Sequence, residues 1–288
     1  MMLRFLIRVS AISFLAIPLL ATVETSRAAG ADEITAQIEG HVVFVPVRLN
    51  GRGPFQFIVD TGATETIVTP VTARAAGIVI QPYPGLQKKG FVGSLVTGRA
   101  TVTNLEVYIF DPPQALSLRL DEGINYGGIL GYTFLRRFVT TIDYPRHVVC
   151  FQLPAAGNAS PAASGEFTIP FRLVERLIHV NGRVNRGGPL TFLLDTGSAE
   201  ALLVPPIAEQ LKLNSTPLPS YPGARLTTLD QLSVGDATVS QMSAIIHRPP
   251  GERISGATYD GIVGYPFLST FVVTIRYDKA TIGLKPSK

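Results

Sequence analysis

A single cysteine, Cys150, is present among the 288 residues of this sequence, and its isolation limits the covalent chemistry of the chain. No intrachain disulfide can form, so the hydrophobic core must hold the fold together. The thiol lies in the apolar run 148–151, which predicts a buried structural role. No sequence pattern pairs it with a histidine, so a nucleophilic role is not predicted. The histidines are few and share no ligand spacing, so we expect neither a metal site nor a cofactor. They are His41, His147, His179 and His247.

Charged side chains are also scarce, at 16% of the chain, and the net charge of +4 is small. Lysines and arginines are scattered, with no basic run and no interleaved aromatic residues, so the sequence does not predict nucleic-acid binding. A glycine-rich phosphate loop and a Gly-x-Ser-x-Gly nucleophile motif are both missing. Hydrophobic residues make up 46% of the chain, which is typical of a packed globule rather than a disordered polymer.

Only one stretch, at residues 9–23, is apolar and uncharged over a long run. Arg4 and Arg8 precede it and mostly small residues follow it, in the order typical of a secretory signal peptide. Its 15 residues are short for a membrane-spanning helix, which needs roughly 20. We therefore expect a cleaved signal peptide over 1–31, a periplasmic or secreted location, and no stable membrane association after cleavage. An uncleaved anchor is the alternative, and the absence of cysteine there excludes a lipoprotein anchor.

The tripeptide Asp-Thr-Gly, by contrast, occurs twice, at residues 60–62 and 195–197, and each copy lies inside a longer internal repeat. An offset of 135 residues (195 − 60) aligns the segments around both copies. An offset of 133 (259 − 126) aligns a later block that begins at Tyr126 and at Tyr259. Two repeated units of this size predict two similar lobes rather than a solenoid.

The composition between the copies predicts the domain boundaries. Residues 154–165 are small, polar and proline-containing, which is typical of a linker. We therefore expect a first domain over 32–153 and a second over 166–288. Both are rich in short apolar segments separated by turn residues, and 34–49 is typical of β-strand. The sequence thus predicts a mainly β chain in two lobes and no doubly wound parallel sheet.

Each Asp-Thr-Gly copy follows a short apolar strand, expected at 55–59 in the first copy and at 190–194 in the second. A proline then opens a short predicted helix, at 70–76 and at 205–211, because proline is tolerated at a helix start. The aspartates are therefore expected to leave buried strands and enter tight loops.

The paired motif predicts an acid–base centre. Gly62 and Gly197 permit tight turns and close approach of another segment. If the two copies face each other about a pseudo-twofold axis, Asp60 and Asp195 converge. Two carboxylates in contact cannot both be ionised, so they share one proton. One carboxylate can then activate water while the other protonates a carbonyl oxygen, which is the division of labour that peptide hydrolysis needs.

On these residues the chain resembles the retropepsin and pepsin class of aspartic peptidases, and most closely bacterial retropepsin-like proteins with a duplicated domain. The motifs are Phe-Ile-Val-Asp-Thr-Gly-Ala at 57–63, Phe-Leu-Leu-Asp-Thr-Gly-Ser at 192–198, Ile-Leu-Gly at 129–131 and Ile-Val-Gly at 262–264. The resemblance covers roughly 36–152 and 167–284. It implies two retropepsin-like β-barrel lobes with few short helices, related by pseudo-twofold symmetry, and a peptide or protein substrate.

The same resemblance implies roles for individual residues. Asp60 and Asp195 would be catalytic, and Thr61 and Thr196 would hydrogen-bond across the dyad and brace its two loops. Members of this family close a glycine-rich flap over the substrate. The first copy offers Gly90, Phe91, Val92 and Gly93 as flap candidates, whereas residues 225–229 of the second copy contain no glycine.

Two acidic positions lie outside the family motifs. Glu65 and Glu200 match each other in the repeat, and we expect them to be solvated or to form an ion pair between the lobes. Asp260 stands where the first copy has Gly127, and we expect its carboxylate to cap nearby backbone amides.

The sequence therefore predicts an exported aspartic endopeptidase that acts as a monomer, with Asp60 and Asp195 of one chain as the dyad. A homodimer in which each copy pairs with its counterpart in a second chain is the alternative assembly. The alternative function is a catalytically inactive peptide-binding protein on the same fold, which the glycine-free second flap segment would suit.

Overall fold

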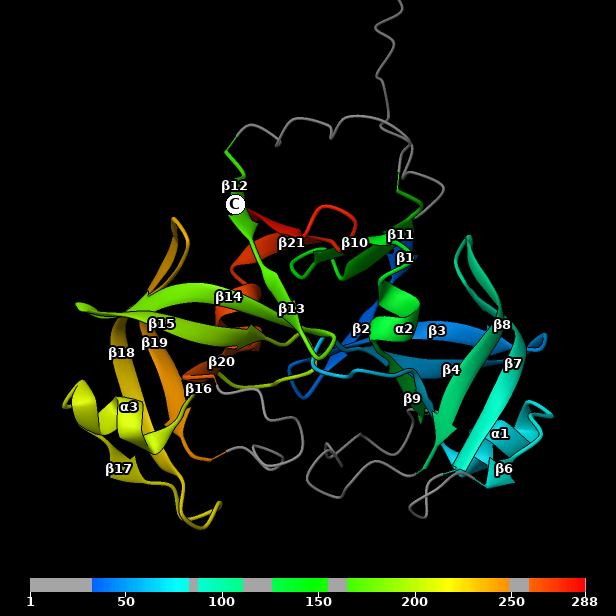
Figure 1. Ribbon diagram of the computed structural model, residues 1–288, viewed down its shortest axis with the longest axis horizontal. Helices are drawn as coiled ribbons and strands as arrows, with labels where there is room; N and C mark the ends of the chain where they lie inside the picture. Colours follow the sequence, from blue (N-terminus) through cyan, green and yellow to red (C-terminus); the bar gives the residue numbers. More distant parts are fainter. Residues whose placement is uncertain (1–32, 83–87, 111–125, 155–164, 249–258, 288) are drawn as a thin grey trace, which may run out of the picture. The chain divides into compact units, whose positions relative to one another are not determined.

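The computed structural model describes residues 33–82, 88–110, 126–154, 165–248 and 259–287, all within one unit, Ala31–Lys288 (Figure 1). The predicted signal peptide over 1–31 and most of the predicted linker over 154–165 lie outside the described residues. In the ranges that are described, no helix is both long and apolar enough to cross a membrane.

Two eight-stranded sheets share one plan, each built from one copy of the repeat (Figure 1). The first has the order β2 (Gln37–Glu39), β3 (Val42–Leu49), β4 (Arg52–Val59), β9 (Tyr126–Leu130), β5 (Ile67–Val68), β8 (Ala100–Ile109), β7 (Lys88–Thr97) and β6 (Gln81–Pro82). The second has the order β13 (Arg172–Val174), β14 (Leu177–Val184), β15 (Gly187–Leu194), β20 (Gly261–Val263), β16 (Leu202–Leu203), β19 (Ala237–Ile246), β18 (Arg225–Val234) and β17 (Thr216–Pro217). Additional pairings of β3 with β7 and of β14 with β18 close six strands of each sheet into a barrel. The predicted pair of β-barrel lobes is confirmed.

A third sheet joins the two copies. Its order is β1 (Glu33–Thr35), β11 (Val148–Gln152), β10 (Val139–Asp143), β21 (Phe271–Arg276), β22 (Thr281–Pro286) and β12 (Phe167–Pro170). At its centre β10 and β21 run antiparallel, so that Thr141 faces its repeat counterpart Thr274 with their hydroxyl oxygens 3.3 Å apart. One hydrophobic cluster includes side chains of both barrels and of this sheet. Backbone hydrogen bonds and a shared core therefore connect the lobes.

The helices are short. They are α1 (Pro70–Ala75), α2 (Tyr132–Leu135), α3 (Pro205–Gln210) and α4 (Tyr265–Leu268). α1 and α3 begin at the predicted prolines, whose missing N–H costs nothing in the first helical turn. The Thr69 hydroxyl caps α1 by accepting a hydrogen bond from the Thr72 N–H at 3.2 Å.

One sequence prediction gains detail and one is wrong. Residues 34–49, predicted as strand, are divided into β1, β2 and β3, and Gly40 and His41 adopt positive φ values of 54° and 67° where the chain reverses between β2 and β3. Cys150 is half-buried rather than buried. Side chains of β11 alternate between its two faces, and Val149 and Phe151 occupy the buried one.

Candidate active site

The backbone of each Asp-Thr-Gly aspartate is held by a parallel strand pair. Asp60 follows β4, which pairs with β9, and Asp195 follows β15, which pairs with β20. The N–H of Asp60 donates to the carbonyl oxygen of Leu130 at 3.1 Å, and that of Asp195 to Val263 at 3.0 Å. Leu130 and Val263 belong to the two repeated apolar–apolar–Gly segments. These segments therefore fix the position of each aspartate backbone at the end of its strand.

The threonines of the two motifs interlock across the lobes. The Thr61 hydroxyl donates to the carbonyl oxygen of Leu194 at 2.7 Å and accepts from the N–H of Thr196 at 3.1 Å. The Thr196 hydroxyl donates to the carbonyl oxygen of Val59 at 2.7 Å and accepts from the N–H of Thr61 at 3.1 Å. Both threonines are buried. Every hydrogen bond of this set joins one lobe to the other, so the two loops are braced as a pair.

The interlocked loops bring the two carboxyl groups into contact. Asp60 is buried, with 8% of its surface exposed, and its carboxyl group hydrogen-bonds that of Asp195. Within each loop an aspartate oxygen accepts the N–H of the following glycine, at 2.7 Å for Gly62 and 2.9 Å for Gly197. A Cβ atom added to Gly62 would lie 2.5 Å from Cγ of Asp195, and one on Gly197 would likewise collide with Asp60. Only glycine allows each loop to support the opposite carboxyl group.

Burial and mutual repulsion make this pair hard to ionise twice. Burial is the main cause that raises the pKa of Asp60 well above its usual range, and the charge of Asp195 raises it further. Burial also raises the pKa of Asp195, but the hydrogen bond from Asp60 and nearby backbone N–H groups oppose that rise. Because the pKa is raised on both acids, the pair keeps one proton, which the two carboxyl groups share.

The flap candidates are not at a hairpin tip. Gly90, Phe91, Val92 and Gly93 lie inside β7, where Gly90, Phe91 and Val92 pair with β8. Val92 is fully buried, and Gly90 lies against the side chains of Ile78 and Ile109. These residues therefore belong to a barrel strand in the structure, and their part in a flap stays a prediction.

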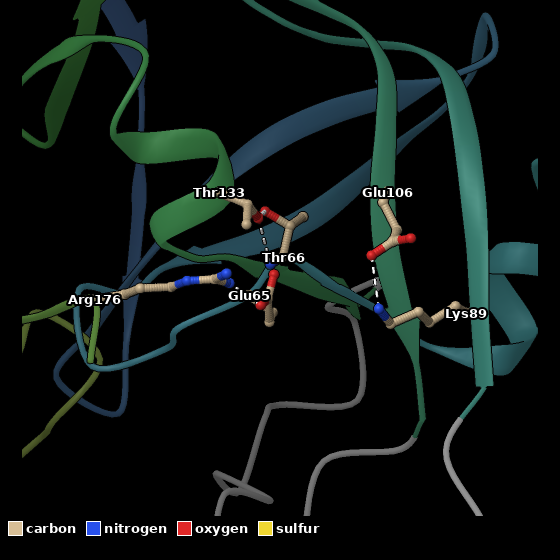
Figure 2. A network of polar contacts seen from close by, with 6 residues as sticks. All are labelled: Glu65, Thr66, Lys89, Glu106, Thr133 and Arg176. Atoms are coloured by element: carbon tan, nitrogen blue, oxygen red, sulfur yellow. Dashed lines mark hydrogen bonds and ion pairs between the residues drawn. The ribbon is translucent and has the colours of Figure 1, made fainter. Parts of the chain in front are cut away.

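The acidic positions outside the family motifs have defined contacts. Glu65 forms an ion pair with Arg176 of the second lobe, as expected for an interlobe ion pair (Figure 2). The carboxylate of Asp260 accepts the N–H of Thr191 at 2.7 Å, so its predicted capping role is confirmed.

In the described ranges, histidine, cysteine and carboxylate side chains do not gather in any group of three or more that could hold a metal ion.

Sequence reasoning missed a set of aromatic and cationic residues beside the two aspartate loops. The rings of Tyr132 and Tyr277 meet edge to face, and so do those of Tyr144 and Tyr265. The repeat alignment contained the signal, because Tyr132 matches Tyr265 and Tyr144 matches Tyr277 at an offset of 133 (265 − 132 and 277 − 144). Each ring pair thus joins one tyrosine of the first copy to one of the second. Tyrosines next to apolar segments are usually core residues, however, and the alignment does not show that the pairs cross between lobes.

Comparison with known proteins agrees with this geometry. Residues 45–137 match a family model described as "gag-polyprotein putative aspartyl protease", and residues 180–267 match one described as "Aspartyl protease". A curated relative, "DNA damage-inducible protein 1" from Phaeosphaeria nodorum, is 27% identical over 115 residues, which are 39% of this chain and 25% of that protein. The alignment thus spans about a quarter of the relative's length.

A solved structure extends the likeness to the whole fold. The crystal structure of an aspartic proteinase from Irpex lacteus superposes with a TM-score of 0.54 at 14% identity, covering 89% of this chain and 97% of that one. At that identity the likeness shows the fold alone, whereas the two family matches address each repeat separately. This chain therefore belongs to the retropepsin- and pepsin-like aspartic peptidases, with the peptidase domain duplicated in tandem.

Proposed function

We propose that Asp60 and Asp195 form the catalytic dyad of an aspartic endopeptidase, with both acids supplied by one chain. In the singly protonated pair, Asp195 accepts a proton from water as the water oxygen attacks the scissile carbonyl carbon. Asp60 gives its own proton to the carbonyl oxygen. The tetrahedral intermediate collapses when the C–N bond breaks and the leaving amine takes a proton from the dyad. The observation that supports this most is the contact of two carboxyl groups, buried in Asp60 and half-buried in Asp195, each resting on a glycine of the opposite loop.

Replacing either acid by its amide tests the dyad. Asp60→Asn and Asp195→Asn are each expected to lower kcat/KM by about 10²- to 10⁴-fold, because an amide cannot relay the proton. The measurement is cleavage of a fluorogenic peptide library between about pH 3 and pH 7, the range in which a shared carboxyl proton persists. Asp230→Asn is the matched control, since Asp230 lies exposed on β18.

The outcomes separate the alternatives. Near wild-type turnover in either dyad variant would rule out an intrachain dyad. If each single variant keeps partial activity and the rate per chain rises with concentration, each copy pairs with its counterpart in the second chain of a homodimer. If the wild-type protein binds a transition-state-mimic inhibitor but cleaves nothing in the library, the chain is a peptide-binding protein on this fold.

We also propose that the chain is exported and acts in the periplasm or outside the cell. The support is the order of charges, apolar run and small residues within 1–31. N-terminal sequencing of protein recovered from the periplasm or medium should find a new terminus after Ala28, Ala29 or Ala31. A mature protein that retains Met1 would contradict the proposal.

A further inference from the structure

Two hairpin turns at equivalent positions of the repeat reach from each lobe to the other. One is Gly40–His41, between β2 and β3, and the other is Glu175–Arg176, between β13 and β14. His41 and Arg176 match at the offset of 135 (176 − 41) and adopt nearly the same backbone conformation, with φ values of 67° and 71°. The same place in the fold thus carries a histidine in one lobe and an arginine in the other.

Arg176 holds the loop of Asp60. Its guanidinium forms the ion pair with Glu65 (Figure 2). It also lies 6.0 Å from the centre of the Tyr132 ring, as in a cation–π contact. The N–H of Tyr132 donates to the carbonyl oxygen of Ala63 at 2.9 Å. Glu65 and Ala63 both belong to the loop that begins at Asp60. A permanent cation of the second lobe is therefore linked to that loop by two routes.

His41 occupies the corresponding place at the loop of Asp195. Its imidazole stacks on the Tyr265 ring, with centroids 4.6 Å apart and planes 9° from parallel. The N–H of Tyr265 donates to the carbonyl oxygen of Ser198 at 2.9 Å. Glu200, the counterpart of Glu65, interacts electrostatically with His41. The ring contact and the tyrosine N–H bond of the first cluster are therefore repeated here, with imidazole in place of guanidinium.

We infer that His41 is a positioning residue whose hold on the Asp195 loop depends on its protonation, whereas Arg176 holds the Asp60 loop at every working pH. The inference rests on the proposed dyad and deepens it. Histidine side chains change charge near pH ~6.5, whereas a guanidinium stays charged. A protonated imidazole attracts both the Tyr265 ring face and the Glu200 carboxylate, and a neutral one loses both attractions.

The sign of the pH dependence follows from the groups that face His41. Burial raises the pKa of Glu200, and the positive charge of His41 opposes that rise. The attraction between them therefore needs an ionised Glu200 and a protonated His41, and it is lost when the imidazole gives up its proton as the pH rises. Burial also raises the pKa of Tyr144, which contacts Tyr265, so this tyrosine stays neutral throughout.

Exchanging the two residues tests the inference. His41→Arg should remove the pH dependence of hydrogen-exchange protection in the Asp195 loop. The reciprocal Arg176→His should impose the same pH dependence on the Asp60 loop. Both exchanges should fold, because each residue already occupies this turn conformation in the other lobe. His147→Gln, an exposed histidine in the turn between β10 and β11, is the matched control.

The first measurement is amide hydrogen exchange of the 195–200 and 60–65 loops between about pH 5 and pH 7.5, corrected for intrinsic exchange. In the wild type, protection of 195–200 should fall relative to 60–65 by about two- to five-fold as the pH rises, the range expected for one exposed charge pair. In His41→Arg, the protection of 195–200 should no longer fall relative to 60–65 as the pH rises. In Arg176→His, the protection of 60–65 should fall as well, so that the ratio of the two loops stays constant. Equal pH responses of both loops in the wild type would overturn the inference.

The second measurement is the pH profile of kcat/KM. His41→Arg should reduce the decline between about pH 5.5 and pH 7.5 by about two- to five-fold, while His147→Gln should leave the profile unchanged. Superimposable profiles of His41→Arg and wild type would also overturn the inference. Loop protection does not depend on turnover, so activity that survives Asp60→Asn would reject the proposed dyad and leave the exchange result to decide on His41.

Discussion

At the scale of single residues, Thr61 and Thr196 have a structural part that is distinct from chemistry. Each hydroxyl donates to a carbonyl oxygen and accepts an N–H from the opposite lobe, so each satisfies two buried backbone groups. Threonine is suited to this place because a hydroxyl can donate and accept at once. The aspartates come into contact because these hydrogen bonds fix the position of each loop relative to the other.

Removing one hydroxyl should therefore weaken the whole protein. Thr61→Val keeps the shape of the side chain but leaves the carbonyl of Leu194 and the N–H of Thr196 without their partner. We expect the free energy of unfolding to drop by about 2–4 kcal/mol, since each buried unsatisfied group costs about 1–3 kcal/mol. Urea denaturation measures this loss.

Thr61→Ser is the control for that change, because it keeps the hydroxyl and should stay within about 1 kcal/mol of the wild type. If the valine and serine variants are equally stable, the crossed hydrogen bonds contribute nothing to the fold.

At the scale of elements, the sequence located strands better than it located turns. The strands that lead into the aspartates are where the apolar runs predict them, and α1 and α3 begin at the predicted prolines. The turn at Gly40–His41 was missed because the flanking residues continue the strand pattern, and few residues other than glycine adopt a positive φ. The sequence did not show that the flap candidates lie within β7, because glycine content alone does not separate a hairpin tip from a strand packed closely against a neighbour.

At the scale of the whole molecule, the buried dyad makes stability depend on pH. Because burial raises the pKa of Asp60, the folded chain binds more protons than the unfolded chain between the unfolded and the folded pKa. The free energy of unfolding should therefore be highest below about pH 4 as far as this group is concerned, and decline as the pH rises through the folded pKa.

The expected slope is at most about 1.4 kcal/mol per pH unit for one proton. Asp60→Asn, which has no proton to lose, should flatten the curve of unfolding free energy between about pH 4 and pH 7. Urea unfolding at several pH values in that range provides the measurement. An unchanged slope in this variant would mean that other groups, and not the dyad, control the pH dependence.

The sequence by itself determined the duplication, the β architecture, the two aspartates and the threonines beside them. These follow from local patterns and from the match between the halves, which need no knowledge of how the lobes meet. The tertiary structure alone decided which residues face each other across the lobes, such as Glu65 with Arg176, 111 positions apart, and His41 with Tyr265. Such contacts depend on the docking that the shared central sheet imposes, because pairing β10 with β21 places each lobe's turn against the other lobe's loop.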